Sequence, residues 1–140
     1  MRIVVATTFV PFRPAAADGP ADALAAACRV DGAEADRVRL PRGADFALAA
    51  RLTDVGADRL VCLDGPAALL PHPARRVWLI DGTGLDATAV RAAVAAAAPA
   101  VHVAGEDVRG RLAAAGVAAG LLPVPADGAA WARVVRALVR

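Results

Sequence analysis

The chain has 140 residues and a net charge of +2; 58% of the residues are hydrophobic, 21% charged and 4% aromatic. This length and composition predict one domain that can bury its own core. All 16 basic residues are arginine, and Lys, Ser, Asn, Gln and Tyr do not occur. These absences exclude a serine nucleophile, a lysine Schiff base and a P-loop.

Several classes of site and location are disfavoured by the same composition. The arginines are dispersed among aspartates rather than clustered, so we expect no nucleic-acid surface. Cys28 and Cys62 are too few and too far apart for a disulfide framework or a zinc site, and we expect both to be small buried hydrophobes. No metal and no cofactor is expected. No apolar run reaches the roughly 20 residues that span a bilayer, and no signal peptide follows Met1, so we expect no transmembrane segment and a cytoplasmic location.

Short β-branched runs alternate with Ala/Leu-rich stretches of helical length, a rhythm typical of repeated βα units. It predicts strands at residues 2–7, 35–40, 59–63, 76–80, 100–104 and 120–124, with helices at 20–29, 45–53, 86–97 and 107–115. Asp86 and Thr88 are expected to start the third of these helices and Pro99 to end it. The predicted fold over residues 1–125 is a single Rossmann-like doubly wound α/β domain. Its sheet is mainly parallel and six-stranded, in the order 3-2-1-4-5-6, with helices on both faces.

The last segment, residues 129–140, places Trp131, Val134, Val135 and Leu138 at helical spacing, so they form one apolar stripe. This pattern predicts an amphipathic helix packed on the same domain. An alternative is that the stripe binds a partner. Trp78 is expected in the core.

Candidate ligand-binding residues follow the predicted strands, because ligands of open α/β sheets bind outside the carboxyl ends of the strands. The loop after the first strand reads "TTFVPFRPAAADG", which lacks the glycine fingerprint of NAD and FAD sites. Arg13 and Arg42 either hold a phosphate or lie exposed among aspartates. Asp64 and Asp81 either face each other across a cleft or cap their loops. His72 is expected as a surface or packing residue, and His102 as a satisfied, partly buried one.

The strings "MRIVVATTFVPF", "ALLPHP", "RVWLID" and "VHVAGEDVRGRLAAAGVAAGLLPVP" resemble glycosyltransferase family 4, whose members are retaining GT-B enzymes. The closing "WARVVRALVR" is similar to the helix that ends such enzymes. The resemblance covers most of the chain. It implies the N-terminal, acceptor-side domain with the C-terminal closing helix, without the donor-binding domain, and a nucleotide-sugar or sugar acceptor as ligand.

The sequence departs from the family pattern at positions that would carry chemistry. Ala15-Ala16 replace a usual Gly-Gly, Asp18 stands where Glu is frequent, Ala104-Gly105 replace Asn-Ser, and Asp64 opens a loop that is commonly basic. Asp81 takes the place of a histidine near the acceptor, where an aspartate would be a poorer general base. The resemblance implies Asp81 as the catalytic position, and the loops add as binding positions Thr8, Arg13, Asp18, Arg42, Asp64 and Glu106.

Two functions remain open from the sequence. The first is a truncated, degenerate glycosyltransferase-like domain, inactive alone, which acts with a donor-binding partner chain, as a homodimer, or as a non-catalytic adaptor. It predicts an apolar patch on the flank where a second domain would pack. The second is a self-sufficient small enzyme that binds a nucleotide or nucleotide-sugar through Thr8, Arg13, Asp64 and Asp81.

Overall fold

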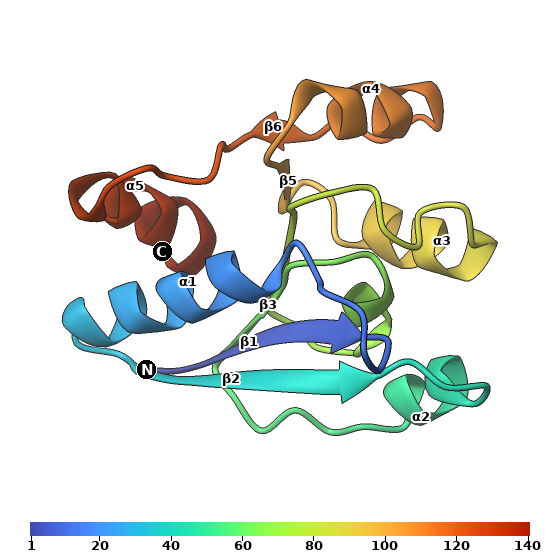
Figure 1. The fold of residues 1–140 in the computed structure, drawn as a ribbon, viewed down its shortest axis with the longest axis horizontal. Helices are drawn as coiled ribbons and strands as arrows, with labels where there is room; N and C mark the ends of the chain where they lie inside the picture. The colour runs from blue at the N-terminus through green and yellow to red at the C-terminus, as the bar shows by residue number, and fades with distance from the viewer.

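The computed structural model describes all of residues 1–140 and contains one six-stranded, entirely parallel sheet with helices on both faces (Figure 1). The predicted α/β class is confirmed. A short 3-10 helix, η1, was not predicted. The elements in chain order are β1 (Arg2–Phe9), α1 (Asp18–Val30), β2 (Glu34–Pro41), α2 (Phe46–Arg51), β3 (Arg59–Cys62), η1 (Pro66–Leu69), β4 (Arg75–Leu79), α3 (Thr88–Ala96), β5 (Val101–Val103), α4 (Glu106–Ala114), β6 (Gly120–Leu121) and α5 (Gly128–Val139).

The strand order is β2-β1-β3-β4-β5-β6, so the predicted order 3-2-1-4-5-6 is wrong in the place of the third strand. β3 pairs with β1 and β4 rather than lying outside β2. The physical reason is burial: Leu60, Val61 and Cys62 of β3 are all inaccessible, as expected for a strand covered on both faces. β2 buries only Ala35 fully and therefore suits the edge of the sheet.

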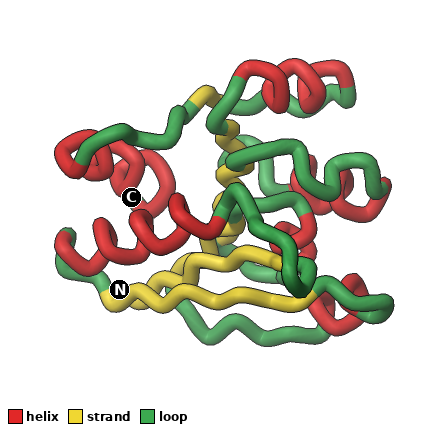
Figure 2. Tube along the Cα trace, in the orientation of Figure 1, coloured by secondary structure: helices red, strands yellow, loops and turns green.

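Two hydrophobic clusters fill the two sides of the sheet. On one side, α1 and α5 lie against each other (Figure 1). Both pack against side chains of the central strands, including Ile3, Val61 and Trp78. On the other side, residues of α2, η1, α3 and α4 pack against the alternate positions of the strands. Figure 2 shows the strands between these two groups of helices. The sheet therefore has the two covered faces that the sequence rhythm predicts.

α5 is held on the domain by apolar and polar contacts. Val134, Val135 and Leu138 are buried, and the rings of Trp131 and Trp78 form an edge-to-face contact with 5.9 Å between centroids. Arg140, which follows the helix, pairs with Asp31 at the end of α1. In the segment that leads to α5, the carbonyl of Leu122 accepts a hydrogen bond from the Trp78 indole Nε1 at 2.8 Å. The amphipathic stripe is thus used for packing within this chain. None of the helices combines the length and the apolar character needed to cross a membrane.

Two local predictions have different outcomes. α3 begins at Thr88, but neither Asp86 nor Thr88 caps it with a side chain; Asp86 instead pairs with Arg111 at 3.2 Å. Cys28 and Cys62 are both free and buried, as expected. Burial, with a smaller contribution from Asp31, raises the pKa of the Cys28 thiol to about 11, so this thiol is unreactive at neutral pH.

Candidate functional site

The carboxyl ends of β1, β2, β3 and β4 surround a small cavity of about 70 Å³. It brings together four of the predicted site residues, one from the end of each strand or from the loop that follows it. The parallel register of neighbouring strands explains this arrangement, because their carboxyl ends meet at one edge of the sheet. The four residues are Thr8, Arg42, Asp64 and Asp81.

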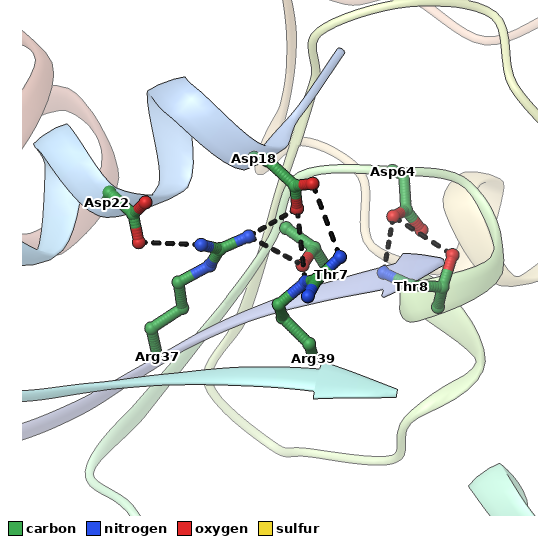
Figure 3. Close-up of polar contacts among 7 residues, drawn as sticks. All are labelled: Thr7, Thr8, Asp18, Asp22, Arg37, Arg39 and Asp64. Atoms are coloured by element: carbon green, nitrogen blue, oxygen red, sulfur yellow. Dashed lines mark hydrogen bonds and ion pairs between the residues drawn. The ribbon is translucent and has the colours of Figure 1, made fainter. Parts of the chain in front are cut away.

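Asp64 is 4% exposed and is fully engaged by backbone and hydroxyl donors (Figure 3). Its Oδ2 accepts hydrogen bonds from the Thr8 amide at 2.6 Å and the Thr8 hydroxyl at 3.0 Å. Its Oδ1 accepts from the Ala67 amide at 2.9 Å. Burial raises the pKa of this carboxyl, and the three hydrogen bonds and the nearby Arg42 act in the opposite direction. Asp64 therefore ties the end of β1 to the start of η1.

The loops after β3 and β4 approach each other closely at Gly65. A β-carbon at this position would lie 2.9 Å from the Thr83 carbonyl and 2.7 Å from a methyl group of Val90. Glycine therefore permits an approach that any other residue would obstruct. Gly65 thus allows the loop after β3 to pack against the loop after β4.

Arg42, Asp81 and the Thr83 hydroxyl are the groups at the cavity that keep free hydrogen-bonding capacity. The Arg42 side chain is half-buried, forms no ion pair, and leaves its Nε buried without a partner. Asp81 uses Oδ1 to accept from the Thr83 amide at 3.0 Å, which closes a turn. The cavity thus presents one guanidinium and one carboxylate that is partly committed to its own loop.

Asp18 belongs to a separate cluster that joins α1 to β2 (Figure 3). It pairs with Arg37 and, at 3.4 Å, with Arg39. Arg37 also contacts Asp22 at 2.6 Å and the Thr7 hydroxyl at 3.5 Å. Asp18 is therefore neutralised by two arginines. The alternation of Arg37 and Arg39 in an edge strand was the available signal for this cluster, and the sequence analysis missed it.

Arg13 and Glu106 are not brought to the cavity. Arg13 is exposed in the loop after β1 and forms no side-chain hydrogen bond or ion pair. Glu106 is exposed and pairs with Arg109 of its own helix at 3.2 Å. Ala15 and Ala16 line the cavity, whereas the Ala104-Gly105 pair does not.

The two histidines differ from each other. His72 is a packing residue, as expected: Nε2 contacts the Ala57 carbonyl at 2.8 Å, and Nδ1 accepts from the Ala74 amide at 3.0 Å. His102 is half-buried, but its Nδ1 is buried without a partner, so the expectation of a satisfied histidine is wrong. Burial and, secondly, Arg76 lower the pKa of His102. No three His, Cys, Asp or Glu side chains gather where they could hold a metal ion.

Comparisons with protein-family models, with curated proteins and with solved structures found no match. A functional assignment therefore depends on the geometry of the site and on the sequence resemblance.

Proposed function

We propose that this chain is a glycosyltransferase-like domain that corresponds to the acceptor-side half of a GT-B enzyme and is inactive alone. The observation that carries the proposal is the cavity at the carboxyl edge, whose volume is about 70 Å³. Ligand pockets for small organic molecules usually have roughly 300–1,000 Å³. A nucleotide-sugar has no room here, so the donor must be held by another polypeptide surface if transfer occurs at all.

The chemistry of the cavity supports the same proposal. Asp64 uses both carboxylate oxygens to bind donors of its own chain, and the methyl groups of Ala15 and Ala16 occupy the wall. What remains available is the guanidinium of Arg42, one oxygen of Asp81 and the Thr83 hydroxyl. These groups suit a contact to an acceptor hydroxyl or an anionic group, not the binding of a whole donor.

Exposed apolar side chains near this edge support a protein partner. Phe12 is fully exposed in the loop after β1, with a positive φ of 63° that is unfavourable for a bulky residue. Leu48 and Leu52 are 63% and 78% exposed on and beside α2, the helix that follows β2. We propose that a donor-binding chain or a second copy of this chain covers these residues.

The competing function, a self-sufficient nucleotide-binding enzyme, requires Thr8, Arg13, Asp64 and Asp81 to act together. Arg13 lies apart from the cavity, and the Thr8 hydroxyl and the Asp64 carboxylate bind each other at 3.0 Å. Two of the four groups are thus engaged with one another and a third is absent. This arrangement disfavours the second function.

Thermal unfolding in the presence of UDP, GDP and several nucleotide-sugars tests the proposal, because a ligand that binds only the folded state raises the midpoint. We expect no saturable rise with any of them. A dose-dependent rise that Arg42→Gln abolishes, and that a control Arg51→Gln retains, would favour the self-sufficient enzyme instead.

The partner surface is tested separately by sedimentation over a wide concentration range. If a second copy covers the surface, Phe12→Asp reduces self-association, whereas Val30→Asp, at an exposed apolar residue of α1, leaves it unchanged. A strict monomer at high concentration would exclude the homodimer and leave a separate donor-binding chain as the partner.

A further inference from the structure

The opposite, amino edge of the sheet holds a group of basic side chains that the proposed function does not use. Arg59 is the first residue of β3, and Arg76 lies beside Val61 in the parallel register of β3 and β4. Side chains two residues apart on a strand share a face, so Arg59, Val61 and Arg76 lie on one face of the sheet. His102 is paired with Trp78 and therefore lies on that face too.

These basic groups have no compensating acceptors. Neither Arg59 nor Arg76 forms a side-chain hydrogen bond or an ion pair. Arg59 Nε and Nη1, Arg76 Nε and His102 Nδ1 are buried without partners. Asp58, the carboxylate next to Arg59 in sequence, accepts instead from the Arg2 amide at 2.7 Å. Buried polar groups are usually satisfied, so a group of unsatisfied donors indicates a missing acceptor.

Like-charge repulsion is visible in the ionisation of the same side chains. Burial lowers the pKa of Arg59, and Arg76 adds to the effect. Burial and Arg76 also lower the pKa of His102. Each shift has the sign expected where positive charge is partly desolvated and no anion is near. An anion bound between these groups would relieve both causes.

A cavity of about 390 Å³ opens at this edge. Its walls are Arg59, Arg75 and Arg76 together with the segments that precede β4 and β5, which contain His72 and otherwise only alanine and proline. No wall residue carries an acidic or amide side chain. The cavity thus combines positive charge, unsatisfied donors and a volume within the range typical of small-molecule sites.

Arg75 differs from its neighbours in being anchored. It donates to the carbonyls of Ala68 at 2.7 Å, Leu70 at 3.1 Å and Ala93 at 3.1 Å. These contacts tie η1 and α3 to β4 and fix one positive charge beside the cavity. Arg75 is therefore a positioning residue, whereas Arg59 and Arg76 are available to a ligand.

We propose that the cavity at the amino edge binds a phosphate dianion, free or carried by a phosphorylated small molecule, through the guanidinium groups of Arg59 and Arg76. A planar guanidinium forms paired hydrogen bonds to phosphate oxygens, and two of them match the two negative charges of the dianion. The site lies at the edge opposite to the cavity with Arg42 and Asp81, so its test is independent of the test of the glycosyltransferase-like function.

The test is calorimetric titration and ³¹P NMR of the full chain with inorganic phosphate, glycerol 3-phosphate and ribose 5-phosphate, at an ionic strength held constant with NaCl. We expect saturable binding at one site, weakened at least tenfold in Arg59→Gln and in Arg76→Gln. Arg133→Gln is the matched control because Arg133 is an exposed arginine of α5 without an ion pair, and it retains the binding of the unmodified chain.

Comparison of the three ligands distinguishes the source of the anion. Tighter binding of either phosphomonoester than of inorganic phosphate assigns the site to a phosphorylated small molecule, and the reverse order assigns it to the free ion. Binding that does not saturate, or that Arg133→Gln weakens as much as Arg76→Gln, would overturn the proposal. The Gln variants remain informative about folding as well, since each removes a repulsive charge and is expected to unfold at a temperature no lower than the unmodified chain.

Discussion

The two edges of the sheet differ in the charge that they bury. Each edge holds a guanidinium Nε without a partner, that of Arg42 at the carboxyl edge and those of Arg59 and Arg76 at the amino edge. Only the carboxyl edge also buries a carboxylate, Asp64, whose two oxygens accept hydrogen bonds from the same chain although burial raises its pKa. No acidic side chain lines the cavity at the amino edge.

This contrast teaches where binding is to be sought in the molecule. Ligands of open parallel sheets are expected at the carboxyl edge, but here the cavity at that edge has only about 70 Å³. A carboxylate whose oxygens already accept hydrogen bonds is stabilised little by a ligand. A guanidinium group without a neighbouring carboxylate is stabilised electrostatically when an anion binds beside it. Whether a charged side chain already has hydrogen-bond partners in the chain, more than its place in the fold, therefore indicates whether it stabilises the structure or is available to a ligand.

The largest predicted effect is at Asp64. Asp64→Ala leaves the Thr8 amide, the Thr8 hydroxyl and the Ala67 amide without their acceptor in a buried place. At about 1 kcal/mol or more for each buried donor, we expect the free energy of unfolding to fall by about 3 kcal/mol, measured by urea denaturation.

Asp81→Ala is the matched control at the same edge. Asp81 is half-buried and accepts one amide hydrogen bond within its own turn, so we expect a loss of about 1 kcal/mol or less. Equal losses in the two variants would show that Asp64 has no special structural role and would remove the contrast between the two edges.

The sequence was sufficient for the parts of the structure that depend on local pattern. Alternating strand and helix runs gave the fold class, and Trp78 and both cysteines are buried as expected. The position predicted for β3 in the sheet was wrong, because strand order depends on which faces each strand buries. At the candidate site, the structure brings Thr8, Arg42, Asp64 and Asp81 to one cavity at the ends of the strands. The predicted topology did not indicate that Asp18 pairs with Arg37 and Arg39.

The amino-edge arginines were missed for a physical reason. The sequence does not distinguish an arginine that lies in water from one that lies beside a partly buried cavity. Arg59 is the first residue of β3 and Arg76 the second of β4, and positions at the start of a strand are usually solvated. Only the three-dimensional neighbourhood, with Asp58 bound to the Arg2 amide, shows that no carboxylate compensates them.

Substitution of Arg37 tests whether an arginine with carboxylate partners stabilises the folded chain. Its side chain is 16% exposed and contacts Asp18, Asp22 and Thr7. We expect Arg37→Ala to lower the free energy of unfolding by about 1–2 kcal/mol, because a partly buried, charge-assisted network is lost. Arg2→Ala is the control: the Arg2–Asp36 pair is more than half exposed, and such pairs contribute about 0–1 kcal/mol. A smaller effect at Arg37 than at Arg2 would contradict this account.

Removing a positive charge at the amino edge is predicted to act in the opposite direction. Arg76→Gln relieves repulsion of Arg59 and His102, so we expect the midpoint of thermal unfolding to rise at low salt. The rise should be about 1–2 °C, as roughly 0.5 kcal/mol gives in a chain of this size. It should shrink as NaCl is added, because salt screens the repulsion. Arg133→Gln should leave the midpoint nearly unchanged, and a salt-independent decrease in Arg76→Gln would show that Arg76 is already satisfied.

The last predicted effect is the pH dependence of stability that His102 confers. Because its pKa in the folded chain is lowered from 6.5 by burial and Arg76, the unfolded chain binds more protons just below pH 6.5. Stability is therefore full above pH 6.5 and decreases as the pH falls through that value, by at most about 1.4 kcal/mol per pH unit for one proton. The raised pKa of Asp64 gives the opposite slope at pH above 3.8.

Subtraction separates the two titrations. The difference in unfolding free energy between the unmodified chain and His102→Gln, measured by urea denaturation from pH 7.5 to pH 5, contains the His102 contribution while that of Asp64 cancels. We expect the unmodified chain to lose stability relative to His102→Gln as the pH falls. Bound phosphate should reduce the His102 slope, because an anion beside Arg76 favours the protonated ring. A slope that phosphate leaves unchanged would separate His102 from the proposed anion site.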